Sequence, residues 1–178
     1  VLQAGANALQ VRAQSGVFIA SGTTNASGGY AIDTTPGPYY FLAAESTTYV
    51  GEVWPDVQCR EGYCSGSDLQ AGTSFSTLFG ETLTRDFALT RAGRITGTVI
   101  NQATGQPAAA VLVEAAFGDP PRRFATSAAT TNSQGQYTLE GLPPGTYYLW
   151  TRSVQGLQDE IFGGGACVGT CEPRQAVE

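Results

Sequence analysis

Apolar and polar residues alternate with a period of two in the most strongly patterned segments of this 178-residue chain. The alternation is clear over residues 87–89, 95–99 and 147–150. Such a pattern is typical of a strand with one buried face, and no stretch of a dozen residues shows the period of an amphipathic helix. Short strands separated by Gly, Pro and Asn predict an all-β fold of the sandwich type.

Four blocks of sequence occur twice, about 108 residues apart and in the same order. The pairs are residues 24–32 and 131–139, 36–40 and 144–148, 52–54 and 160–162, and Cys59 and Cys167. Four matches in one register indicate a tandem duplication. The first pair has Asn and Gly at the spacing of a tight turn, so we expect a hairpin tip in each copy.

The two copies differ in extent. The second opens with residues 93–100, which have no counterpart in the first, whereas the first closes with residues 83–90, which have none in the second. We therefore expect two tandem β-sandwich domains. Residues 1–91 form a domain without its opening strand, and residues 92–178 form one without its closing strand.

In each copy the alternation assigns one side of the strands to a buried core. The expected core is Leu9, Val11, Tyr30, Ile32, Tyr39, Phe41, Phe87 and Leu89 in the first copy, and Ile95, Val99, Val111, Val113, Tyr137, Leu139, Tyr147 and Leu149 in the second. Burial of each such side chain contributes about 1.5–3 kcal/mol.

The second copy carries a family-like signature. It reads Gly-x-Ile-x-Gly-x-Val at 93–99, Thr-Gly-x-Pro at 104–107, Thr-Asn-x-x-Gly-x-Tyr-x-Leu at 131–139 and Gly-Leu-Pro-Pro-Gly-x-Tyr at 141–147. This resembles the carboxypeptidase regulatory-like domain, in the prealbumin-like (transthyretin-like) group of Ig-like Greek-key sandwiches that also contains Cna-B repeats. The resemblance implies spacers, stalks, adhesin repeats or accessory domains, and some relatives of the fold bind carbohydrate. A chain without lysine cannot form the internal isopeptide bond of some Cna-B-like domains.

The amino-acid composition excludes several classes of catalytic and metal-binding site. All nine cationic residues are arginines, and histidine is absent, which excludes Ser-His and Cys-His catalytic pairs, a lysine Schiff base and histidine metal ligands. Fifteen acidic residues give a net charge of −6, which disfavours nucleic acid and anionic membranes as partners. No apolar run approaches the roughly 20 residues of a membrane span. We expect a protein that is not an enzyme, with no cofactor and no metal site.

Cysteines occur as one closely spaced pair in each copy, Cys59 with Cys64 and Cys167 with Cys171. Two local disulfides are the favoured interpretation, and they predict an extracellular or cell-surface location. A zinc site shared by the four thiolates and four free thiols are the alternatives.

Tyr148 and Trp150 are the candidate ligand-binding residues. If Tyr147 and Leu149 face the core, Tyr148 and Trp150 point outward and form a stacking platform for a sugar ring or a peptide. A glycan is therefore a candidate partner. The competing interpretation is that neighbouring residues cover both side chains.

Two polar features have simpler explanations than a site. Asn25 begins a glycosylation sequon, but the chemistry of the turn already accounts for it. Asp56, Glu61 and Asp68 surround the first cysteine loop and have oxygen atoms of the type that binds calcium, without the spacing of a calcium loop.

These features predict a structural repeat of a stalk, adhesin or filament. Sandwiches that lack an edge strand expose unpaired backbone groups, so neighbouring chains are expected to complete each other head to tail by strand exchange, as a homo-polymer. The alternative is a longer array in which adjacent residues supply the strands. The runner-up functions are a carbohydrate-binding module and an accessory domain of a secreted enzyme.

Overall fold

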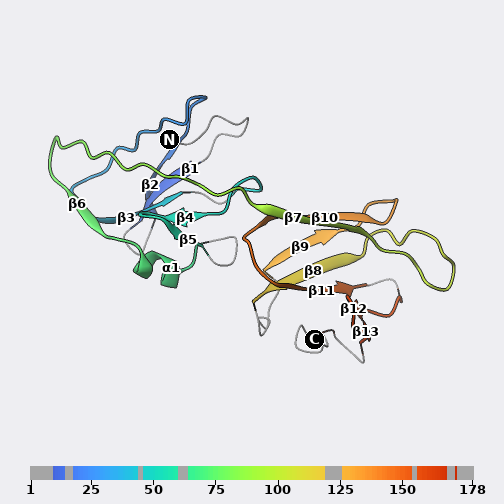
Figure 1. Ribbon diagram of the computed structural model, residues 1–178. Coiled ribbons are helices and arrows are strands. Elements are labelled where there is room, and N and C mark those ends of the chain that lie inside the picture. The colour runs from blue at the N-terminus through green and yellow to red at the C-terminus, as the bar shows by residue number, and fades with distance from the viewer. Residues whose placement is uncertain are drawn as a thin grey trace. The chain divides into compact units, whose positions relative to one another are not determined.

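The fold is mostly β, with one short helix among the described residues (Figure 1). The computed structural model describes residues 10–14, 18–43, 46–59, 64–118, 126–153, 156–167 and 171. The chain divides into two compact units, Val1–Ala92 (unit 1) and Gly93–Glu178 (unit 2).

Unit 1 is built around one antiparallel sheet with the strand order β2-β1-β3-β4-β5. A further strand, β6, pairs with the first residues of β3. Its elements are β1 (Gln10–Gln14), β2 (Phe18–Thr23), β3 (Gly37–Ala43), β4 (Glu52–Val53), β5 (Val57–Gln58), α1 (Gly66–Ala71) and β6 (Phe75–Thr77).

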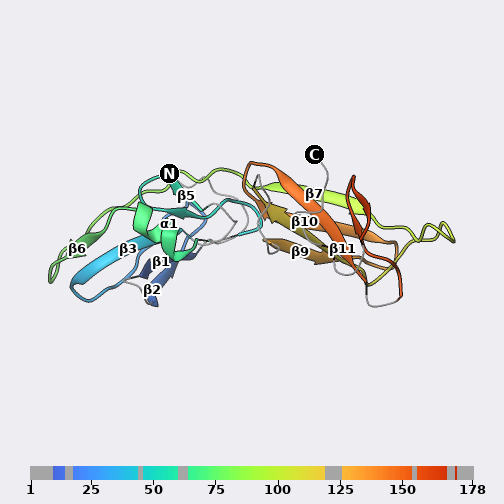
Figure 2. The ribbon, with the colours of Figure 1, turned by 90° about the horizontal axis from the view of Figure 1, so that it is seen from below.

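Unit 2 consists of a five-stranded sheet in the order β9-β8-β11-β12-β13 and a separate two-stranded sheet of β7 and β10 (Figure 2). Its strands are β7 (Gly93–Thr98), β8 (Leu112–Phe117), β9 (Ser127–Thr130), β10 (Gln136–Leu142), β11 (Tyr147–Arg152), β12 (Glu160–Ile161) and β13 (Gly165–Ala166). Taken in chain order, the five-stranded sheets of the two units have the same strand order.

The same turn precedes the central strands in both units. Asn25 begins one turn and Asn132 the other, and each side-chain Oδ1 accepts two backbone N–H groups at 2.9–3.0 Å. Gly28 and Gly135 have φ angles of 83° and 72°, a region that favours glycine. The sequence pattern of Asn followed by Gly therefore marks a real turn in each copy.

A tyrosine corner also occurs twice. The Tyr147 hydroxyl donates a hydrogen bond to the Pro143 carbonyl at 2.7 Å, and the Tyr39 hydroxyl donates one to the Thr35 carbonyl. Each bond ties the start of a central strand to the residues that lead into it.

The expected core residues whose side chains are described are all buried or half-buried. In unit 2 the core lies between the two sheets and contains Ala115, Leu139 and Leu142, packed by Ile95, Ala129, Tyr137, Tyr147 and Leu149. In unit 1 it contains Ala13, Tyr39 and Phe87, packed by Tyr30, Ile32, Tyr49, Trp54, Phe75 and Leu89. Leu9 and the side chains of Val11 and Phe41 lie outside the described residues.

The helix α1 was not expected, because its six residues are too few to show a helical period. Its first turn is capped locally: Asp68 Oδ2 accepts a hydrogen bond from the Ser65 backbone N–H at 2.7 Å. The Asp68 carboxylate is buried by this contact.

Candidate functional site

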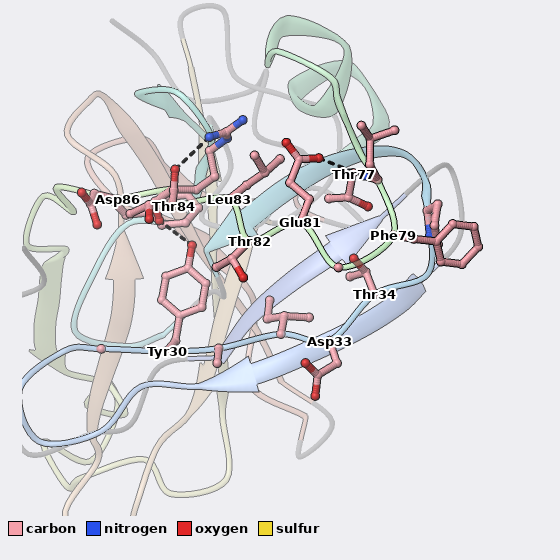
Figure 3. A pocket seen from close by; sticks show the side chains of 18 of the residues that line it. Tyr30, Asp33, Thr34, Thr77, Phe79, Glu81, Thr82, Leu83, Thr84 and Asp86 are labelled. Atoms are coloured by element: carbon pink, nitrogen blue, oxygen red, sulfur yellow. Dashed lines mark hydrogen bonds between the residues drawn. The ribbon is translucent and has the colours of Figure 1, made fainter.

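A cleft of about 770 Å³ opens in unit 1 between two extended segments, residues 27–36 and 77–87 (Figure 3). We call residues 27–36 the first wall and residues 77–87 the second wall. Tyr30, Ile32 and Phe87 in the lining belong to the hydrophobic core of the unit. The exposed carboxylates of Asp33, Glu81 and Asp86 also line the cleft. The cleft therefore gives access to the apolar core past an acidic rim.

Side chains in both walls alternate between covered and exposed positions, as in a β-strand, but the two walls are not paired with each other. Over residues 28–34 the even-numbered positions are half-buried and the odd-numbered positions exposed, and over residues 83–89 the odd-numbered positions are the covered ones. In the part of the chain that the structure describes, no backbone hydrogen bond joins the walls. The expectation that residues 83–90 form a paired strand is therefore wrong. The segment is extended. Among the described residues, its one backbone hydrogen bond with another strand-like segment lies at its end, where the Val50 N–H donates to the Thr90 carbonyl at 3.0 Å.

Tyr30 crosses the cleft from one wall to the other. Its hydroxyl donates a hydrogen bond to the Arg85 carbonyl at 2.5 Å. Burial, followed by the negative charge of Asp86, raises the pKa of Tyr30 to about 12, although the Arg85 charge acts in the opposite direction. The hydroxyl therefore remains a hydrogen-bond donor well into the alkaline range.

Arg85 anchors the second wall to the core. Its guanidinium carbon lies 4.6 Å from the centroid of the Trp54 ring and 4.8 Å from that of Phe75, and the two rings meet edge to face at 84°. Cation–π contacts of this kind contribute about 0.5–1 kcal/mol or more each. Tyr30 thus links the two walls, and Arg85 links the second wall to Trp54 and Phe75. No sequence pattern predicted these contacts.

Both predicted disulfides are present, Cys59–Cys64 and Cys167–Cys171. Their Cα–Cα distances of 4.7 and 5.3 Å lie in the usual range. The first disulfide packs on Val53 beside α1. Each one closes its own loop and makes no link to the other unit.

The interpretation that neighbouring residues cover Trp150 is confirmed, and the alternative of an exposed ring is wrong. Only 4% of its surface is accessible, and its Nε1–H donates a hydrogen bond to Glu114 Oε2 at 2.9 Å. The ring belongs to a second small core: Ala116, Ile161, Cys167 and Cys171. The cysteine loop covers the outer face of the sheet, so alternation along β11 does not separate inside from outside. Tyr148 is half-buried, and the expected open platform of two aromatic rings is not formed.

One part of the chain matches a known protein family. Residues 94–160 match the model of the carboxypeptidase regulatory-like domain family. Over these residues unit 2 is similar to that family. The match runs from β7 to the first residue of β12, and the family is a non-catalytic module of the prealbumin-like group. No curated protein and no solved structure matches the chain.

The disulfide of unit 2 lies beyond the residues that match the family model. Around the disulfide of unit 1, Asp56 is exposed at a turn, Asp68 caps α1, and Glu61 lies outside the described residues. In the described ranges no three His, Cys, Asp or Glu side chains are grouped to hold a metal ion. Among these residues no helix has the length and apolar character to cross a membrane.

Proposed function

We propose that this protein is a non-enzymatic, extracellular structural repeat module, of the kind that builds stalks, adhesins or filaments. Three findings support the proposal. Residues 94–160 match a non-catalytic family, the two units have the same five-strand order, and both disulfides fit an oxidising compartment. Its task is to connect and to hold.

The cleft of unit 1 is the observation that carries the assembly part of this proposal. Its two walls are extended, alternate as strands do, and form no backbone hydrogen bonds with each other. Unpaired strand edges acquire a strand from another chain readily. Because such a contact joins two different surfaces, repetition gives an open head-to-tail polymer.

Light scattering coupled to size-exclusion chromatography tests the assembly over a series of protein concentrations. We expect the average mass to rise with concentration through multiples of the monomer mass. Phe162 is 82% exposed in unit 2, so the Phe162→Ser variant serves as a control for non-specific association through apolar surface. The wild type and this variant should assemble alike. A monomer at every concentration would refute head-to-tail assembly.

An accessory domain of a secreted enzyme is the second candidate, and the match to a regulatory-like family favours it. A catalytic domain encoded in the same open reading frame would support this alternative. A carbohydrate-binding module is no longer supported, because that function depended on an exposed Trp150 and Trp150 is buried.

A further inference from the structure

The asparagine turns of the two units differ in one residue pattern. Residues 25–27 read Asn-Ala-Ser, which is the acceptor motif for N-linked glycans, whereas residues 132–134 read Asn-Ser-Gln. No other asparagine of the 178-residue chain begins such a motif. Because both turns form with the same backbone bonds to asparagine Oδ1, the turn needs the asparagine but not a hydroxyl two residues later. Turn chemistry therefore explains Asn25 and leaves Ser27 unexplained.

The Ser27 hydroxyl helps to fix the orientation of the Asn25 side chain. It donates a hydrogen bond to Asn25 Oδ1 at 2.7 Å, and the backbone N–H groups of Ser27 and Gly29 donate to the same oxygen at 3.0 and 2.9 Å. Three donors identify this atom as the amide oxygen, because the amide nitrogen cannot accept them. The NH2 group is therefore the end of the side chain that the turn does not use.

The contacts of the amide nitrogen differ between the units. Asn25 is exposed, and among the described residues its Nδ2 donates no hydrogen bond. In unit 2 the Nδ2 of Asn132 donates to Gln136 Oε1 at 3.3 Å. Gly29 is the equivalent of Gln136, and a Cβ atom at Gly29 would lie 3.3 Å from Asn25 Nδ2. Glycine thus leaves space beside the Asn25 nitrogen, where unit 2 has a side chain.

We propose that Asn25 is an acceptor site for an N-linked oligosaccharide. The donor class is an oligosaccharide linked to a polyprenyl pyrophosphate. Asn25 Nδ2 bonds to the anomeric carbon of the first sugar, and the bond from that carbon to the pyrophosphate oxygen breaks. The pyrophosphate leaves with the electron pair of the broken bond and takes one proton from Nδ2. Oδ1 is not consumed, so the three bonds of the turn remain. This proposal rests on the extracellular location proposed above.

A glycan on Asn25 lies beside the cleft of unit 1. Ser27, Gly28 and Gly29 line the cleft at the beginning of the first wall. N-linked glycans are bulky and hydrophilic, and they keep the surface that carries them in contact with solvent. The modification therefore shields this part of the first wall from other chains.

Mass spectrometry of the full chain, secreted from a eukaryotic cell line, tests the acceptor site. We expect a glycopeptide that contains Asn25. Treatment with a peptide N-glycosidase in water labelled with heavy oxygen should release the glycan and convert the Asn25 side chain to a labelled carboxylate. Secreted protein in which Asn25 is unmodified in every copy would overturn the proposal.

Two variants separate the motif from the turn. Ser27→Ala removes the hydroxyl and keeps the backbone bonds to Asn25 Oδ1, and the glycan should be lost. Ala26→Ser is the matched control, because it changes an exposed residue of the same turn and keeps the motif. Its glycan should be retained. Retention of the glycan in Ser27→Ala, or equal loss in both variants, would contradict the role given to the motif.

The outcomes separate this proposal from the function proposed above. If Asn25 carries a glycan and the chain is monomeric at every concentration after the glycan is removed, the acceptor site stands and head-to-tail assembly fails. If the chain assembles and Asn25 is unmodified in the secreted protein, assembly stands and the acceptor site fails.

Discussion

Replacement of Gly97 by alanine tests whether the tyrosine ring beside β7 dictates glycine at this position. An ideal Cβ atom would lie 2.6–2.8 Å from three atoms of Tyr137, well inside the carbon contact distance of about 3.5–4 Å. The ring or the strand must therefore shift. Overpacking of this kind costs about 1–3 kcal/mol, and we expect Gly97→Ala to lower the free energy of unfolding of unit 2 by that amount.

The effect of Gly97→Ala on the free energy of unfolding should change sign once the Tyr137 ring is removed. In a Tyr137→Ala background the added methyl group meets open space. Alanine in a strand interior is then more stable than glycine by about 0.5–1 kcal/mol, because it loses less backbone entropy on folding. The double-mutant cycle of Gly97→Ala and Tyr137→Ala should thus give a coupling free energy of about 1.5–4 kcal/mol.

Tryptophan fluorescence can report on unit 2 alone. The chain has two tryptophans, Trp54 in unit 1 and Trp150 in unit 2. In a Trp54→Phe background, urea unfolding followed through buried Trp150 gives the free energy by linear extrapolation. Gly93→Ala, where the added Cβ lies 3.4 Å from its nearest neighbour, is the control in the same strand. An equal loss from Gly97→Ala with and without the tyrosine would refute the reasoning.

Three further predictions concern contacts in both units. Thr131→Val removes a buried hydroxyl that bonds two backbone groups at 2.7 and 2.9 Å, and urea unfolding should show a loss of about 2 kcal/mol or more. Serine at both Cys167 and Cys171 should cost about 2 kcal/mol or less, and acrylamide should quench Trp150 more strongly; unchanged quenching would mean that the loop is not its cover. Tyr30 has a pKa of about 12 in the folded chain against an ordinary 10.0, so its contribution is complete below pH 10 and is lost as the pH rises through 12. Tyr30→Phe should remove this part of the alkaline decline in urea-measured stability, and an unaltered decline would contradict the assignment.

The sequence predicted the features that depend on local chemistry. Asn132 and Gly135 marked a turn because asparagine can bond the backbone of its own turn and glycine tolerates a positive φ. Cys167 and Cys171 marked a disulfide because they lie within one loop. The alternation in β10 correctly placed Leu139 in the core, since that strand has one covered face.

Features that depend on distant segments were not predictable in this way. Alternation places Trp150 on the face of β11 away from the main core, but it could not decide whether that face is exposed or covered, because the covering residues Ile161, Cys167 and Cys171 come from later in the chain. Residues 83–90 have the pattern of a strand, but pairing requires a neighbouring strand, which pattern alone does not supply. The cleft between the walls and the hydrogen bond of Tyr30 across it were not predicted, because both depend on how residues 27–36 and 77–87 pack together.

The position of the two disulfides has a mechanical consequence. Cysteines 5 and 4 residues apart close loops so small that almost none of the contour length of the chain is held covalently. A pull on both ends therefore meets only non-covalent resistance, and 178 residues can extend to about 600 Å. If such units are joined in series, as proposed, stretching would unfold them while leaving both disulfide-closed loops intact.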